Sequence, residues 1–113
     1  MKNIWAVGRN SIGLLCLFLL LYSCTSTEKR TPKTYTVEIK QMQFQPAEIT
    51  VQKGDTILWM NHDMVAHDVT EYPDKAWTSG PLPPDKSWSM VAAKSVNYYC
   101  SIHMVMKGKI IVQ

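Results

Sequence analysis

Hydrophobic and polar residues alternate along most of the chain from residue 34 to its end. Tyr35, Val37 and Ile39 are separated by single polar residues, and this period of two is typical of a strand with one buried face. The run TILWM at residues 56–60 predicts a short strand that is buried on both sides. Met42 and Phe44 continue the alternation of residues 35–39 until Pro46, and other alternating segments occupy residues 49–51, 87–90, 96–100 and 110–112.

No segment has a helical period long enough to outweigh these strands, so the chain is predicted to be all-β. Turn signals such as Gly54 with Asp55 separate the strands. Seven or eight short strands within about 80 residues favour a β-sandwich. A domain of this size buries only about 60% of the surface that its unfolded chain exposes, so a bound metal would add useful stability.

The first part of the chain has the pattern of an export signal. Lys2 and Arg9 precede an apolar run at residues 12–22, which is short for a bilayer span and suits a signal peptide. The letters LYSC at residues 21–24 resemble the lipobox of bacterial lipoproteins. We therefore expect a signal peptide at residues 1–23, a lipidated Cys24 and a flexible polar tether at residues 24–33. The alternative is an ordinary secretion signal that leaves Cys24 as a free thiol.

The number of cysteines and the net charge of the chain limit the classes of protein to which it can belong. With Cys16 in the signal peptide and Cys24 lipidated, Cys100 is the single cysteine of the domain at residues 34–113, so no disulfide is expected within it. A lone cysteine in an oxidising compartment needs a reason, and metal ligation is one. Beyond the signal peptide, ten Lys and Arg residues against nine Asp and Glu residues give a net charge of about +1. No basic tract indicates nucleic-acid binding.

The C-terminal segment places three soft or borderline metal ligands at steps of three: Cys100, His103 and Met106. A structural alternative exists, because cysteine and methionine are also common core residues. His67, in the loop that follows Trp59, supplies a second imidazole. Two histidines, a cysteine and a methionine are the ligand set of blue copper electron-transfer sites. We therefore interpret these residues as a site for one copper ion.

These motifs resemble those of the cupredoxins, and within that family the amicyanins and plastocyanins. The likeness is carried by CSIHMVMKGKIIV at residues 100–112, GDTILWMNHDMVAHDV at residues 54–69 and SGPL at residues 79–82. It implies a Greek-key β-sandwich of the cupredoxin type and one-electron exchange with transiently docked redox proteins. It also implies a copper site whose ligands are His67, Cys100, His103 and an axial Met106.

The loop departs from the amicyanin pattern at several positions. Ile102 and Met104 stand where amicyanin has prolines, so a less rigid loop is expected. Asp68 follows the ligand histidine where these relatives usually have asparagine. We expect Asp68 to accept a hydrogen bond from the Ser101 hydroxyl and, being anionic, to favour Cu(II).

The leading interpretation is a monomeric, lipid-anchored electron carrier in the periplasm or cell envelope of a bacterium. Four protein ligands leave no open position for a substrate, so an enzyme is not expected. The alternatives are a protein that binds copper for delivery or tolerance, and a structural lipoprotein with a vestigial sandwich. His62 is expected to be a solvated loop residue. An apolar docking patch around the exposed edge of His103 is expected for redox partners, formed by Met64, Val65, Met104 and Val105, with loop padding as the alternative for Met64.

Overall fold

The computed structural model describes residues 26–113, of which residues 31–113 form a compact unit. The predicted signal peptide at residues 1–23 and the lipidation site Cys24 lie outside the described residues, so both stay predictions. Residues 26–33 are exposed and have no regular secondary structure; their role as a tether also stays a prediction. Within residues 26–113 there is no helix of the length and hydropathy needed to cross a membrane.

The described part of the chain contains eight short strands and no helix, which confirms the all-β prediction. The strands are β1 (Thr34–Lys40), β2 (Gln43–Gln45), β3 (Glu48–Val51), β4 (Thr56–Asn61), β5 (Thr70–Tyr72), β6 (Ser87–Val91), β7 (Val96–Tyr99) and β8 (Lys107–Val112).

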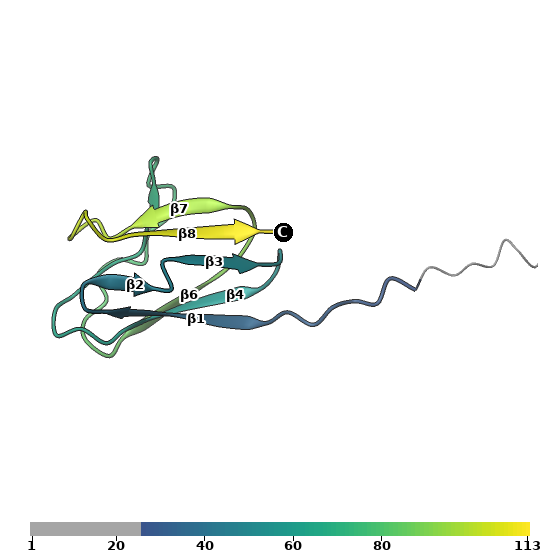
Figure 1. Ribbon diagram of the computed structural model, residues 1–113, viewed down its shortest axis with the longest axis horizontal. Coiled ribbons are helices and arrows are strands. Elements are labelled where there is room, and N and C mark those ends of the chain that lie inside the picture. Colours follow the sequence, from purple (N-terminus) through teal and green to yellow (C-terminus); the bar gives the residue numbers. More distant parts are fainter. Residues whose placement is uncertain (1–25) are drawn as a thin grey trace, which may run out of the picture. The chain divides into compact units, whose positions relative to one another are not determined.

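The strands form two four-stranded sheets, in the orders β2-β1-β4-β6 and β3-β8-β7-β5 (Figure 1). Two neighbouring pairs, β1 with β4 and β3 with β8, run parallel, and the other pairs run antiparallel. The chain therefore crosses repeatedly between the two layers, because parallel neighbours cannot be joined by a simple hairpin. This arrangement confirms the predicted Greek-key sandwich.

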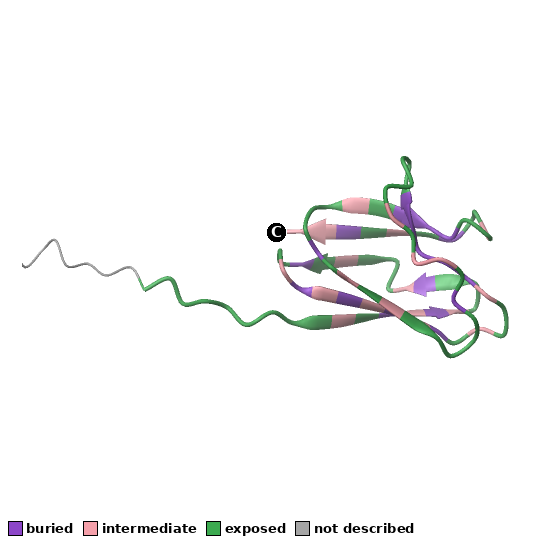
Figure 2. Ribbon diagram, turned by 180° about the vertical axis from the view of Figure 1, so that it is seen from behind, coloured by how far each residue is buried: buried purple, intermediate pink, exposed green. Residues whose placement is uncertain are grey.

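The hydrophobic core is formed by residues from both sheets, and the strands of both layers carry buried residues, coloured purple in Figure 2. In β4 the inward residues Ile57 and Trp59 are fully buried, whereas Leu58 and Met60 on the other face are only half-buried. The expectation that residues 56–60 are buried on both sides is therefore wrong. The reason is that the second sheet covers one face of β4 and leaves the other nearer to solvent.

A tight turn at Gln41 and Met42 interrupts the alternation that was expected to continue to residue 44. Both residues have positive φ angles, of 54° and 58°, and the chain reverses so that β2 runs antiparallel to β1. A left-handed conformation costs about 1–2 kcal/mol for a residue other than glycine, so the turn needs support from elsewhere. The carboxylate of Asp63 supplies it by accepting the amide hydrogens of Gln41, at 2.7 Å, and of Met42, at 3.0 Å.

An aromatic ring packed over a glycine joins β7 to β8. Tyr98 pairs with Gly108, and a Cβ atom at Gly108 would lie 2.2 Å from Cζ of Tyr98. The Tyr98 ring is buried and contacts two other core aromatic rings edge-on, so it fills the space that the glycine leaves. Since Cys100 lies two residues beyond Tyr98 and Met106 two residues before Gly108, this contact positions both ends of the loop that carries the predicted ligands.

Candidate metal centre

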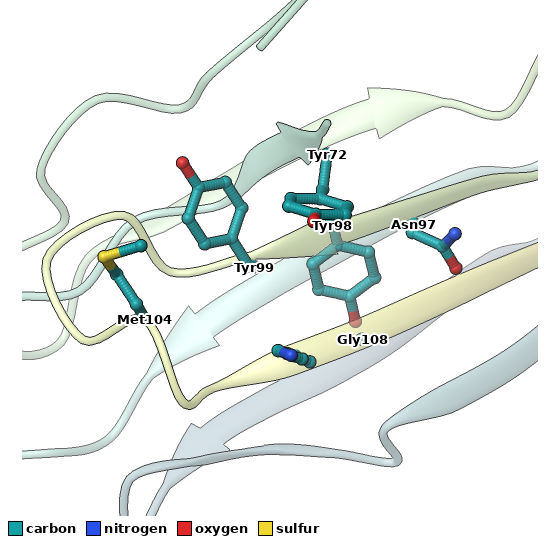
Figure 3. Close-up of a pocket in the computed structure, with 7 residues that line it drawn as sticks. Tyr72, Asn97, Tyr98, Tyr99, Met104 and Gly108 are labelled. Carbon is teal, nitrogen blue, oxygen red and sulfur yellow. The ribbon is translucent and has the colours of Figure 1, made fainter. Parts of the chain in front are cut away.

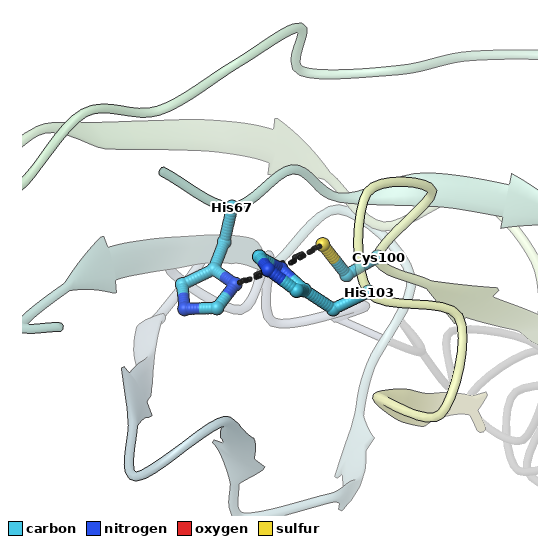
Figure 4. Close-up of side chains that lie close together, drawn as sticks. All are labelled: His67, Cys100 and His103. Carbon is cyan, nitrogen blue, oxygen red and sulfur yellow. Dashed lines mark hydrogen bonds between the residues drawn. The ribbon is translucent and has the colours of Figure 1, made fainter. Parts of the chain in front are cut away.

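Three of the predicted ligands converge near the end of β7, which lies opposite the C-terminus marked in Figure 1. His67 lies in the connection between β4 and β5, Cys100 directly follows β7, and His103 lies in the loop between β7 and β8. Their side chains point toward one another (Figure 4). Within residues 26–113 this is the one group of three His, Cys, Asp or Glu side chains close enough to share a metal ion.

The ligand atoms form a compact triangle. Sγ of Cys100 lies 3.8 Å from Nδ1 of His67 and 3.8 Å from Nδ1 of His103, and the two nitrogens are 3.1 Å apart. In a triangle with these sides the point equidistant from the corners lies about 2.1 Å from each atom, compared with metal bonds of about 2.0–2.1 Å to imidazole and 2.3 Å to thiolate in zinc sites. The spacing therefore fits one ion held in a plane by three donors.

Hydrogen bonds fix the orientation of His67. The ring is fully buried, and its Nε2 lies 2.8 Å from Oδ2 of Asp63. A neutral imidazole carries one N–H, so donation from Nε2 leaves the lone pair of Nδ1 directed at the centre of the triangle. The backbone of His67 is held by a reciprocal pair of hydrogen bonds with Leu82, of 3.2 and 2.7 Å.

The loop between Cys100 and Met106 is closed by its own backbone. The amide of Cys100 donates to the carbonyl oxygen of Met106, and the amide of Met106 donates to that of His103, both at 3.0 Å. Met106 is 2% exposed and packs in the same core cluster as Cys100, whereas Met104 is 68% exposed. Of the two thioethers in this loop, only Met106 therefore lies in the interior with the cysteine.

Asp68 connects the two ligand-bearing loops. Its carboxylate accepts hydrogen bonds from the hydroxyl of Ser101, as expected from the sequence, and also from the Ser101 amide at 2.7 Å and the Thr70 hydroxyl at 2.9 Å. In addition, the backbone amide of Asp68 donates to Sγ of Cys100 at 3.3 Å. Hydrogen bonds of this kind to a ligand sulfur tune metal sites.

Two residues that were not predicted from the sequence, Asn61 and Asp63, build the loop before His67. Asn61 is buried, and its side-chain amide donates to the carbonyl oxygens of Val65, at 2.9 Å, and of Leu82, at 2.8 Å. Its side-chain oxygen accepts the amide hydrogen of Asp63 at 2.9 Å. Asn61 is the last residue of β4, and Asp63 stands in the irregular loop that follows, where spacing carries no periodicity. Their roles therefore had no signal in the sequence beyond a polar residue at the end of a strand.

The environment of Asp63 favours its charged form. Burial raises the pKa of this carboxyl, but the amide of Met42, the ring of His67 and the amide of Gln41 act in the opposite direction. Together they hold the pKa of Asp63 below its ordinary value of 3.8. The carboxylate beside His67 is therefore anionic at neutral pH.

The predicted docking patch is exposed. Its four residues, Met64, Val65, Met104 and Val105, have exposed fractions from 48% to 91%, and they come from the two loops that carry the candidate ligands. His103 is half-buried, and His62 is exposed, with its Nε2 3.8 Å from a carboxylate oxygen of Glu38.

A hollow on the sheet that contains β5, β7 and β8 is separate from the triangle of ligands. It has a volume of about 390 Å³ and is lined by residues of β5, β7 and β8 with Met104, including the ring pair Tyr72 and Tyr99, whose centroids lie 5.6 Å apart (Figure 3). None of His67, Cys100 and His103 lines it. This hollow is therefore a feature distinct from the candidate metal site.

The sequence and the fold match one family of proteins. The family model for the cupredoxin-like domain matches residues 13–112, a stretch that includes part of the predicted signal peptide. The chain is 29% identical over 83 residues to an amicyanin of Paracoccus denitrificans and 28% identical over 83 residues to one of Paracoccus versutus. Each match covers 68% of this chain and 63% of the relative, so the chain spans less than two thirds of the length of these relatives.

Solved structures of amicyanin show the same fold. The oxidized state of a proline-to-alanine mutant of amicyanin has a TM-score of 0.65 and 26% identity, with 71% of this chain and 82% of that chain covered. The reduced Cu(I) form of a proline-to-glycine mutant has a TM-score of 0.64 and 25% identity, with 76% and 87% covered.

Proposed function

Because this chain belongs to the cupredoxin-like domain family, we propose that it is a mononuclear type 1 copper protein that carries single electrons between redox proteins. The similarity to amicyanins supports this class of function. The proposed ligands of the single copper ion are His67, Cys100, His103 and, in the axial position, Met106.

The observation that carries the proposal is the triangle formed by the two Nδ1 atoms and Sγ. Two imidazoles and a thiolate in one plane, with a long axial thioether, define the blue copper centre, which when loaded supplies a Cu(I)/Cu(II) couple. The protein's part is to hold the donors in place. The reciprocal backbone bonds of His67, the closed loop at residues 100–106 and the Asp68 carboxylate keep the donor positions nearly unchanged as the charge of the site changes.

Electron transfer fits this arrangement better than catalysis. Four protein donors leave no coordination position for a substrate, and His67, Cys100 and Met106 are buried. His103 is half-buried, and its loop neighbours Met104 and Val105 are exposed apolar residues. We propose that these residues, with Met64 and Val65, form a small apolar surface on which redox partners dock transiently. Small interfaces of this kind are typical of redox encounters.

We also propose that the protein is a monomer held at a membrane of the bacterial cell envelope by a lipid on Cys24. The support is the sequence pattern at residues 21–24 together with the lone cysteine of the domain. Two or more acyl chains give stable anchoring, whereas one chain gives only marginal binding. Cell fractionation tests this: Cys24→Ser is expected to move the protein to the soluble fraction, and a soluble wild type with an unmodified N-terminus would overturn the anchoring.

A redox titration tests electron carriage itself. The copper-loaded protein should take up and release one electron per chain reversibly, over repeated cycles, without losing metal. The competing function, delivery of Cu(I), is favoured by the exposed thioethers of Met64 and Met104 but requires fast release. With His67 and Cys100 fully buried, transfer of Cu(I) to a soluble chelator should be slow, and transfer within the mixing time would favour delivery instead.

A further inference from the structure

We propose that Asp63 is a positioning residue of the copper centre, whose carboxylate fixes the tautomer and ring orientation of His67 and stabilises the oxidised state. This inference rests on the proposed function, since it assigns a role toward the same site. It concerns a residue outside the predicted ligand set, held in a loop between two strands.

The geometry joins Asp63 directly to the outer nitrogen of His67. Oδ2 of Asp63 lies 2.8 Å from Nε2, on a ring that is fully buried. The inner nitrogen, Nδ1, faces Cys100 and His103. With a carboxylate on one nitrogen and the ligand triangle on the other, only the tautomer with a proton on Nε2 satisfies both sides of the ring.

The carboxylate is itself held rigidly. Oδ1 accepts the amide hydrogen of Gln41 at 2.7 Å, and Oδ2 accepts that of Met42 at 3.0 Å as well as the His67 bond. The amide of Asp63 donates to Asn61, and its side chain is 15% exposed. Gln41 and Met42 adopt left-handed backbone angles while giving their amides to this carboxylate. Asp63 therefore occupies one defined position against the ring.

The negative charge of Asp63 affects the donor strength of His67 in a way that a neutral acceptor would not. An anion bonded to the outer N–H makes the inner nitrogen a stronger donor, and carboxylate–histidine pairs of this kind support metal ligands in other proteins. Cu(II) carries the larger charge, so it gains more from the stronger donor and from the nearby negative charge than Cu(I) does. The two imidazoles are unequal in this respect, because among residues 26–113 no carboxylate hydrogen-bonds to the ring of His103.

The test compares three substitutions at Asp63 with a charge control. Asp63→Asn keeps the shape and one acceptor oxygen but removes the charge, Asp63→Ala removes both, and Asp63→Glu restores the charge. Asp74→Asn removes the same charge from an exposed position. Loss of an outer partner typically lowers metal affinity about 10–100-fold. We expect Asp63→Asn to weaken Cu(II) at least about tenfold while Cu(I) changes little, which raises the reduction potential by about 59 mV per tenfold. Asp63→Glu should return the potential toward that of the wild type.

A second measurement uses the metal-free protein. Nitrogen-15 NMR of the imidazoles should show His67 with its proton on Nε2 in the wild type and in Asp74→Asn. In Asp63→Ala, a mixture of tautomers is expected while circular dichroism still reports folded strands. If the reduction potential and the NMR signature of the His67 tautomer both stay unchanged in Asp63→Asn and Asp63→Ala, Asp63 serves only the turn at Gln41 and Met42. The inference is then wrong. A wild type that does not bind copper would overturn the proposed function instead, and the NMR result would still judge the role of Asp63.

Discussion

Replacing Asp68 with alanine should destabilise the metal-free protein by about 2–3 kcal/mol, through loss of the tie between the two ligand loops. Asp68 is 4% exposed, and its carboxylate accepts three hydrogen bonds, two from Ser101 and one from Thr70. Hydrogen bonds to a charged group are worth about 1.5–3 kcal/mol each, but they do not all vanish in the variant. Ser101 is exposed, so water can replace its partner, and Thr70 keeps a hydroxyl contact of 2.9 Å with Thr78. The expected loss is therefore near that of one charged hydrogen bond rather than three.

Urea unfolding of the metal-free protein, followed by circular dichroism, measures this free energy. Ser101→Ala is the matched control, because it removes only the hydroxyl bond and should reduce the free energy of unfolding by about 1 kcal/mol. The reasoning fails if Asp68→Ala unfolds within 0.5 kcal/mol of the wild type, on the order of the scatter for surface substitutions. It also fails if Ser101→Ala lowers the free energy of unfolding as much as Asp68→Ala does, because the connection between the two loops would then depend on the Ser101 hydroxyl bond alone.

Three further predictions concern the core and the axial ligand. Gly108→Ala should cost about 3 kcal/mol or more by overpacking, since its Cβ would lie 2.2 Å from the Tyr98 ring; Gly80→Ala, with open space but a φ of 66°, should cost only about 1–2 kcal/mol. Equal losses in urea unfolding would contradict this. Burial raises the pKa of Tyr98 from 10.0 to about 12, so the unfolded state loses its proton first as the pH rises. The contribution of Tyr98 is complete below pH 10 and is lost toward pH 12, by about 2–3 kcal/mol. Tyr98→Phe should lack this extra loss, and a parallel decline in both proteins would refute it. Met106→Leu should shift the potential and the visible spectrum, whereas Met104→Leu should leave both nearly unchanged; the reverse result would assign the axial thioether to Met104.

Local patterns were enough to predict most of the fold. The period of two identified the strands that face the core, because one sheet covers one face of each strand. The pattern failed at Gln41 and Met42, where polar and apolar residues still alternate but the chain turns back. The support for that turn comes from Asp63, about twenty residues later. A contact of this range has no trace in the local pattern.

Some residues of the candidate site could also be predicted from local patterns, and others could not. Cys100, His103 and Met106 have a regular spacing on one loop, so they could be recognised together, and the structure brings His67 to the first two. The Asp68–Ser101 hydrogen bond could be anticipated because Asp68 adjoins a predicted ligand. Asn61 and Asp63 could not, because their roles depend on where the backbone of Val65, Leu82 and Met42 lies in space.

The visible absorption spectrum of the copper-loaded protein, recorded beside that of Cys100→Ser, decides whether this chain holds a blue copper centre. A thiolate bound to Cu(II) in a trigonal site gives intense charge-transfer absorption and a blue colour. We expect a blue wild type with one copper per chain, and a folded Cys100→Ser variant that has lost the colour. A wild type that binds Cu(II) without colour, or a Cys100→Ser variant that stays blue, would contradict it.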